Sequence, residues 1–270
     1  MKSVIIYTYF FSPSSNYNLA FFVKKELQER KERSDMDFII VINGFVCDET
    51  IIIPTNLSNV TILKRPNEGY DFGGHAYALK YLEENHKKTY DYYFFMNSGV
   101  IGPILPNYWD ILTPSIHWSS LFIRKITDVV KVVGTTIVCL PGYDAGGYGP
   151  KVEGFFFMTD AIGLGILEKE GTVFRNHATK YDAIVQGEYG VSRSIFKGGY
   201  SIDCMLPKYQ NIDWRDPKNH THNEHRHPSR KGTYFGQSIQ PYEVIFHKWF
   251  WHGEDTVQFE TIRDYVAESG

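Results

Sequence analysis

The sequence lacks the features that mark membrane and secreted proteins. No apolar run reaches the roughly 18 to 20 residues that a helix needs to span a bilayer. Residues 1–7 lead into a strand pattern instead of a signal peptide with a small-residue cleavage site. The cysteines, Cys47, Cys139 and Cys204, are odd in number and far apart, so they offer neither a disulfide framework nor zinc-ligand spacing. We therefore expect a soluble, cytoplasmic chain with no membrane span.

An excess of one charge sign is also missing. The chain has 28 Lys and Arg against 31 Asp and Glu, a net charge of −3. This balance gives no general attraction to nucleic acid or to an anionic membrane, so we do not expect a nucleic-acid partner. With 270 residues, of which 43% are hydrophobic, the chain is long enough to bury a large core. No repeat or low-complexity linker divides it, and a single domain over residues 1–270 is expected.

What is present is an alternation of strand and helix patterns. Apolar, β-branched runs at residues 4–10, 38–42 and 60–63 predict buried strands, and the spacing of apolar residues predicts a helix over 74–88. Such an alternation is typical of α/β proteins. It predicts a mostly parallel central sheet with helices on both faces.

Residues 65–79, RPNEGYDFGGHAYAL, connect the third strand to this helix. A pair of glycines there lets the backbone approach a ligand closely, and a helix N-terminus favours anionic oxygens. One cation and two side chains suited to ribose or base hydroxyls flank the glycines. The alternative is a turn that needs positive φ before an ordinary helix. The candidate ligand-binding residues of this stretch are Arg65, Asn67, Asp71, Gly73 and Gly74.

Residues 90–103 predict a buried strand that ends abruptly in Asn97, Ser98 and Gly99. In a parallel sheet this strand delivers those residues to the edge that carries the glycine stretch, close to a bound diphosphate. A plain strand-ending turn would look the same.

Together, residues 65–74 and 95–103 resemble two motifs of GT-A-type glycosyltransferases, the donor-binding loop and the position of the metal-binding acidic motif. The resemblance extends over roughly residues 1 to 206 and is greatest to soluble glycosyltransferases of plants, algae and large algal viruses. It implies a GT-A-like (Rossmann-like) fold. The donor-binding half would be about residues 1–105 and the acceptor-side half about 106–270.

The resemblance also implies the reactants. They are a nucleotide-sugar donor, with a uridine diphosphate sugar favoured and UDP-xylose as the specific expectation, and a carbohydrate or glycoprotein-glycan acceptor. The resemblance further implies that His247 and Lys248, near the C-terminal end of the sequence, contact the diphosphate. Residues 241–252 also fit an aromatic edge segment that covers the core. The complete set of expected donor-binding residues is Thr8, Tyr9, Arg65, Asn67, Asp71, Gly73, Gly74, Asn97, Ser98, Gly99, His247 and Lys248.

The chain departs from the family at the metal-binding motif. The family carries Asp-x-Asp where this chain has Asn97-Ser98-Gly99, which removes both carboxylates that would hold Mn²⁺ or Mg²⁺. No metal-ligating residue is therefore predicted, and the need for a divalent metal stays open. Without it, Arg, Lys or His side chains and helix N-termini would have to neutralise the leaving diphosphate.

Inverting transfer needs one carboxylate to accept the proton of the attacking hydroxyl. Glu188 is the first candidate, because residues 186–202 resemble the base-supplying helix start of inverting GT-A enzymes. An acid at a helix N-terminus also stabilises that helix in any protein. Glu153, at a strand start, and Asp144, in a glycine-rich loop that could be a flap or a plain crossing, are the rivals.

A run of four histidines follows. His220, His222, His225 and His227 predict a solvated loop, with a cationic lid over the diphosphate as the alternative to it and no helical spacing that would favour a metal site. Two other functions remain open at this stage. One is a non-catalytic nucleotide-sugar or glycan-binding module, and the other is a different α/β nucleotide enzyme, which would need clustered acids for a metal.

Overall fold

The computed structural model describes residues 1–30, 33–85, 89–113, 115–142 and 149–248. Its centre is a seven-stranded sheet in the order β3-β2-β1-β4-β8-β5-β9. Strand β8 runs antiparallel to both of its neighbours, and the other pairs of this sheet are parallel. The strands are β1 (Ser3–Phe10), β2 (Met36–Asn43), β3 (Val60–Arg65), β4 (Tyr92–Asn97), β5 (Val130–Gly134), β8 (Phe156–Asp160) and β9 (Ser201–Cys204). A separate antiparallel pair joins β6 (Ile137–Cys139) to β7 (Pro150–Val152).

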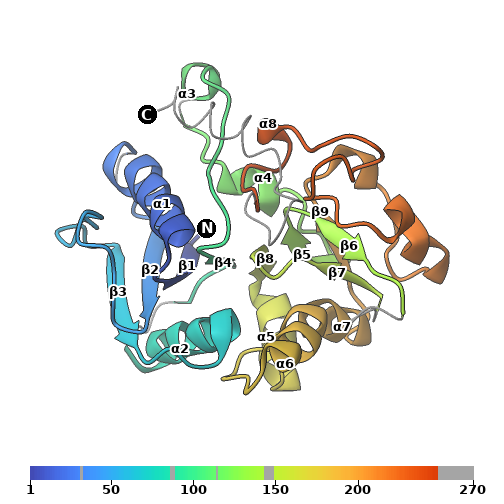
Figure 1. The fold of residues 1–270 in the computed structure, drawn as a ribbon, viewed down its shortest axis with the longest axis horizontal. Helices are drawn as coiled ribbons and strands as arrows, with labels where there is room; N and C mark the ends of the chain where they lie inside the picture. Colours follow the sequence, from blue (N-terminus) through green and yellow to red (C-terminus); the bar gives the residue numbers. More distant parts are fainter. Residues whose placement is uncertain (31–32, 86–88, 114, 143–148, 249–270) are drawn as a thin grey trace.

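The helices cover both faces of the sheet (Figure 1). On one face lie α1 (Pro13–Phe22), η1 (Val23–Gln28) and α4 (Ser119–Ile123), and on the other lie α2 (Tyr70–Asn85), α5 (Ala161–Glu170) and α7 (Tyr189–Lys197). The predicted α/β class, with a mostly parallel central sheet between helices, is confirmed. The shorter segments are α3 (Trp109–Leu112), α6 (Lys180–Asp182), η2 (Ala183–Glu188), η3 (Pro207–Tyr209), η4 (Pro217–His225) and α8 (Pro241–Val244).

The core divides into two clusters, one on each face. Alternate residues of β1 belong to opposite clusters: Ile5 packs with the α1 side and Ile6 with the α2 side. Because both faces are buried, the strands read as continuous hydrophobic runs, and this is why residues 4–10 and 38–42 were recognisable as strands.

The glycine pair lies at a different place from the one predicted, and its contact with a donor stays a prediction. Helix α2 begins at Tyr70, so Gly73 and Gly74 lie inside its first turns and not in a turn before it. The position that needs glycine for its backbone is Gly69, with φ +69°. Gly74 is needed for packing, because a Cβ there would lie 2.5 Å from Thr8 Cγ2. The glycines thus bring the start of α2 close against β1.

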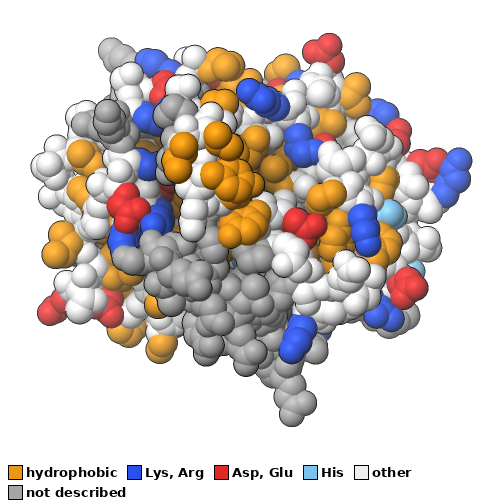
Figure 2. Space-filling view, turned by 90° about the horizontal axis from the view of Figure 1, so that it is seen from above, with side chains coloured by type: hydrophobic (Ala, Val, Ile, Leu, Met, Phe, Trp, Pro, Cys, Tyr) orange, Lys and Arg blue, Asp and Glu red, His pale blue; other side chains and the backbone are white. Residues whose placement is uncertain are grey.

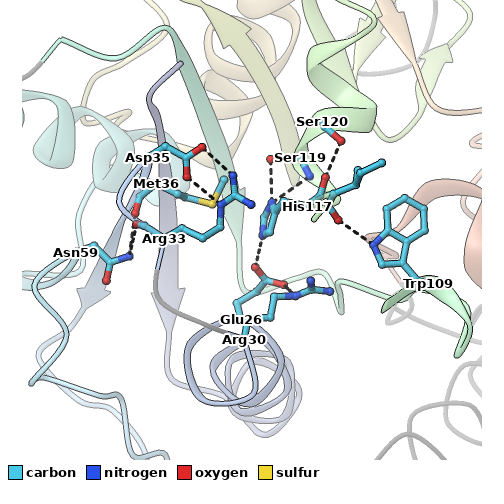
Figure 3. Close-up of polar contacts among 11 residues, drawn as sticks. Glu26, Arg30, Arg33, Asp35, Met36, Asn59, Trp109, His117, Ser119 and Ser120 are labelled. Atoms are coloured by element: carbon cyan, nitrogen blue, oxygen red, sulfur yellow. Dashed lines mark hydrogen bonds and ion pairs between the residues drawn. The ribbon is translucent and has the colours of Figure 1, made fainter. Parts of the chain in front are cut away.

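A buried charged cluster ties η1 to the segment before α4 (Figure 3). The carboxylate of Glu26 accepts from His117 Nε2 at 2.8 Å and pairs with Arg30 Nε at 2.8 Å, and His117 Nδ1 lies 2.9 Å from Ser119 Oγ. Burial alone would raise the pKa of Glu26, but the contacts with His117 and Arg30 outweigh it and hold the pKa below its usual value.

Glu26→Gln is expected to lower the free energy of unfolding by about 2 kcal/mol near pH 7, because it removes the buried charge that pairs with the partly buried Arg30 and accepts a hydrogen bond from the buried His117. The folded-state pKa of Glu26 is depressed, so its stabilisation is fully present above the unfolded pKa and is lost as pH falls from there through the lower folded-state pKa. Urea unfolding of both proteins at pH 7 and pH 3 measures this. A difference that does not shrink at the lower pH contradicts the assignment.

Figure 2 views the molecule from the side of α3 and shows hydrophobic atoms gathered near the middle of this face, with acidic and basic side chains scattered around them. The exposed apolar side chains of the α3 segment are Tyr108, Ile111 and Leu112. In the part of the chain that the structure describes, no helix combines the length and the apolar character needed to cross a membrane.

Candidate active site

The parallel strands end together at one edge of the sheet. In register, β1 ends at Phe10 beside Asn43 of β2, and Asn43 lies beside Arg65 of β3. Asn97 of β4 pairs with Thr8 of β1, two residues before the end of β1. Helix α2 begins at this edge, which is where open α/β sheets bind ligands.

Asp71 and Asn97 meet at this edge, as the two sequence motifs predicted. The amide of Asn97 donates through Nδ2 to Asp71 Oδ2, and its Oδ1 accepts from the N–H of Gly99 at 2.8 Å. Burial raises the pKa of Asp71, and the charge of Glu188 raises it further. The bond from Asn97 and the charge of Lys248 act in the opposite direction without cancelling this.

Behind this pair lies a network centred on the ammonium of Lys151, which β7 supplies. Its Nζ contacts Glu188 Oε2 and lies 3.3 Å from Glu153 Oε2. Burial lowers the pKa of Lys151, but the two carboxylates outweigh it and raise the pKa above its usual range. Burial also raises the pKa of Glu153, while Lys151 and His227 drive it well below normal. Lys151 and Glu153 are therefore both charged at neutral pH.

The local backbone explains how Glu188 reaches this network. A Cβ on Gly154 would lie 2.6 Å from Glu188 Cγ, so the missing side chain at residue 154 makes room for the carboxylate. The expectation that Glu188 begins a helix is wrong. It closes the π-helical segment η2 inside a helical run that starts at α6 and continues into α7. Its place is therefore not explained by a helix N-terminus, and π-helical turns are frequent at functional sites.

The C-terminal part of the chain adds His227 and Lys248 to the network around Lys151. His227 Nδ1 lies 2.8 Å from Glu153 Oε1. The backbone of His247 exchanges hydrogen bonds of 2.9 and 2.8 Å with Ile101, which fixes the next residue beside the end of β4. Lys248 Nζ lies 5.6 Å from the ring centroid of Phe155 and 3.6 Å from the place of a Cβ on Gly99.

A pocket of about 610 Å³ opens next to Asp71 at the same edge. Aromatic rings, amides and carboxylates line it, and the described lining holds no lysine or arginine. The guanidinium of Arg65 is buried under it and donates to Asn176 Oδ1 at 2.7 Å and Asn43 Oδ1 at 3.2 Å. Its lining residues include Phe10, Asn43, Asn67, Tyr70, Asp71 and His177.

The remaining predicted donor residues lie at the strand ends. Thr8 is buried, with its hydroxyl 3.0 Å from His75 Nδ1, and its carbonyl accepts from the N–H of Ser98 at 2.9 Å. Tyr9 is buried and donates to Asn16. These contacts align β1 with its neighbours, and a direct contact of Thr8, Tyr9 or Ser98 with a donor stays a prediction. Asp144 lies outside the described residues.

The histidines do not form one solvated loop. His222 packs edge-on against Tyr209, with ring centroids 4.6 Å apart, and His225 Nδ1 lies 2.9 Å from the carbonyl of Cys139. His220 contacts the carbonyl of Trp214 at 3.1 Å, so only His227 among the four is placed against a candidate catalytic carboxylate. No sequence signal distinguishes it from its neighbours, and Lys151 likewise carries none.

The residues at the end of β4 do not fit a divalent cation. Within the described ranges no group of three His, Cys, Asp or Glu residues could hold a metal ion. Asp71 shares its carboxylate with the amide of Asn97, and the ammonium of Lys248 lies over Gly99, where it would repel a dication. A positive side chain thus lies where the GT-A resemblance places a metal.

No family model matches the chain, and no curated protein matches it. Among solved structures it is similar to a mannosyltransferase from Pyrobaculum calidifontis, solved with GDP-mannose and Mn²⁺, at 12% identity and a TM-score of 0.45, over 75% of this chain and 53% of that one. It is similar to the galactosyltransferase LgtC, solved with donor and acceptor sugar analogues, at 12% identity and a TM-score of 0.47, over 98% and 95% of the chains. S. aureus TarS with UDP-GlcNAc gives 13% identity and a TM-score of 0.41, over 69% and 53%.

The chain thus spans about half the length of the mannosyltransferase and TarS chains. At these identities and TM-scores, the likenesses say nothing about the chemistry of this protein.

Proposed function

We propose that the protein is a glycosyltransferase of GT-A type that moves a sugar from a nucleotide-sugar donor to a carbohydrate acceptor. One observation supports this most strongly. The two motifs that resemble GT-A enzymes are 26 residues apart at Asp71 and Asn97, yet their side chains are hydrogen-bonded to each other beside a pocket and a carboxylate network. This pairs a place for a donor with groups that can handle a proton.

Because the positive side chains lie outside the pocket, the nucleoside and the diphosphate of the donor would occupy two neighbouring regions. The pocket of about 610 Å³ holds aromatic rings, amides and carboxylates but no described cation, so it suits the uncharged nucleoside and not the diphosphate. The diphosphate would lie beside it, where Lys248 and the N-terminus of α2 supply positive charge. This arrangement balances the leaving group without a metal ion.

The donor half, residues 1–105, would provide most of the pocket lining, which residues 176–178 of the other half complete. Residues 106–270 would also provide Lys151, Glu153, Glu188 and Lys248 on the acceptor side. Within this proposal the transfer inverts the anomeric centre. A uridine diphosphate sugar is the favoured donor, and UDP-xylose is the specific candidate.

A donor screen tests the proposal. We expect one of UDP-xylose, UDP-N-acetylglucosamine or GDP-mannose to raise the melting temperature by several degrees, since a ligand at 100 times its Kd adds about 2.7 kcal/mol of stability. The same donor should release nucleotide slowly, and EDTA should change neither result. Binding without nucleotide release in the presence of any sugar acceptor would favour the non-catalytic binding module. If no sugar nucleotide stabilises the protein, the transferase proposal fails.

A further inference from the structure

A second cavity, of about 800 Å³, lies between helices α2 and α5 on the face of the sheet that these helices cover (Figure 1). It shares no described lining residue with the pocket beside Asp71. The residues that α2 supplies to it begin at Ala76, more than one helical turn after Asp71. Its volume is in the range of cavities that hold small organic molecules. The cavity is therefore a separate candidate binding site, outside the GT-A motifs.

Each of the two helices turns one stripe of side chains toward the cavity. The stripes follow helical spacing, in which residues three, four and seven positions apart share a face. The stripe residues are Ala76, Leu79 and Glu83 of α2, and Leu164, Leu167 and Glu168 of α5. Both walls of the cavity are therefore largely aliphatic, with one glutamate on each side.

Aromatic side chains complete the apolar lining. Tyr93 of β4 and Phe174 both line the cavity, are half-buried, and pack against the core cluster on the α2 side of the sheet. Leu82 adds a buried aliphatic side chain. Because both aromatic side chains keep part of their surface exposed, an apolar group in the cavity would remove that surface from water.

The two glutamates of the cavity repel each other. Glu83 and Glu168 are exposed, and neither carboxylate forms a hydrogen bond or an ion pair within the part of the chain that the structure describes. Burial raises the pKa of Glu168, and the charge of Glu83 raises it further. Lys80 also lines the cavity, but its ammonium pairs with Glu84 at 3.7 Å. A positive group between Glu83 and Glu168 would relieve their repulsion.

The lining favours an organic cation over a metal ion or an anion. Two carboxylates offer too few ligands for a divalent metal, and within the described ranges no group of three His, Cys, Asp or Glu residues could hold one. An anion would add a third negative charge to the pair of glutamates. The apolar remainder of the lining suits a hydrocarbon or aromatic body.

We propose that the cavity between α2 and α5 binds a small organic cation, an ammonium or guanidinium group attached to an apolar body. The positive group lies between Glu83 and Glu168, where each carboxylate accepts a charge-assisted hydrogen bond. The apolar body lies against Leu164, Tyr93 and Phe174. The inference does not depend on the proposed transferase function, because it uses none of the residues of the candidate active site.

The test uses three probes of similar shape, which are phenylbutylammonium, phenylbutanol and phenylbutyrate. Each is titrated at pH 7 into the deuterated full chain, and the shifts of the amide NMR signals give the Kd. We expect the ammonium to bind about tenfold more tightly than the carboxylate, with the alcohol between them, because the two glutamates attract the first probe and repel the last. The amides that shift should belong to α2, α5 and Tyr93.

Two variants make the probe experiment specific. Combining Glu83→Gln with Glu168→Gln should make the three affinities nearly equal, since the apolar lining is unchanged. Glu84→Gln is the matched control, because Glu84 is the next residue of α2 but pairs with Lys80 outside the lining, and it should keep the preference for the ammonium. Melting temperatures confirm that both variants fold.

Three results would overturn the inference. One is equal binding of the ammonium and the carboxylate to the wild type, and another is a preference that survives in the double glutamine variant. The third is the lack of amide shifts in α2 and α5 with every probe at millimolar concentration, which would show that the cavity does not hold an apolar ligand. A failure of sugar nucleotides to bind would leave these measurements unchanged, so the proposed function and this inference fail separately.

Discussion

Lys151→Met is expected to lower the free energy of unfolding by about 3–5 kcal/mol at pH 7, the largest stability effect that we predict. The ammonium lies between two carboxylates, and 4% of the lysine and 5% of the Glu153 side chain are exposed. Methionine fills much of the same volume but leaves the buried carboxylate of Glu153 and the partly exposed carboxylate of Glu188 without the cation between them. Burial and repulsion would then both disfavour the folded state.

Acidification separates this effect from a simple loss of packing. Without Lys151, burial should raise the folded-state pKa of Glu153 above its unfolded value. The penalty is then present at pH 7 and falls as the pH drops through this raised value. Urea unfolding at pH 7 and pH 5 measures this. Lys197→Met is the control, since Lys197 is 72% exposed and pairs with Glu170 at the surface, where such pairs contribute about 0–1 kcal/mol. A loss below about 1 kcal/mol for Lys151→Met would contradict a charged network.

The fold was predictable where burial decides the pattern. Residues 4–10 and 38–42 form almost continuous apolar runs because both faces of β1 and β2 are covered, and such runs are visible in the sequence. The start of α2 was not predictable in this way, because the helix begins at Tyr70, four residues before Gly74. The need for glycine at residue 74 comes from a neighbour in space and not from a turn. Thr8 Cγ2, far away in sequence, leaves no room for a Cβ at residue 74. A glycine pair looks the same whether a ligand, a turn or a neighbouring strand requires it.

The candidate site shows the same division. Asp71 and Asn97 follow strands that end at one edge, so topology predicted that they would meet. Glu153 and Glu188 were singled out separately, but nothing in the sequence indicates that Lys151 joins them. His227 looked like its three neighbours, because its partner is 74 residues away in sequence and the contact depends on how the connecting segments pack.

Lys248→Met is expected to reduce kcat by about 100- to 1,000-fold, the largest effect on turnover, equivalent to about 2.7–4 kcal/mol of transition-state stabilisation. In the proposed transfer, charge would develop on the diphosphate as its bond to the sugar breaks, and a fixed cation next to it would act most strongly at that point. Lys248 is the cation that the structure places at the end of β4, over Gly99 and against Phe155. Its loss should therefore lower kcat more than it raises KM for the donor.

Two comparisons make the Lys248 experiment specific. Lys208→Met is the matched control, because its ammonium also lies over aromatic rings, 4.9 Å from the centroid of Phe235, but outside the candidate site. Mn²⁺ added to Lys248→Met should not restore activity, since Asp71 and Asn97 alone offer too few ligand oxygens for a divalent ion. Restoration by Mn²⁺ would show instead that Lys248 blocks a functional metal site. A cation at the end of β4 would then compete with the metal for that place, and the metal-independent mechanism would be wrong.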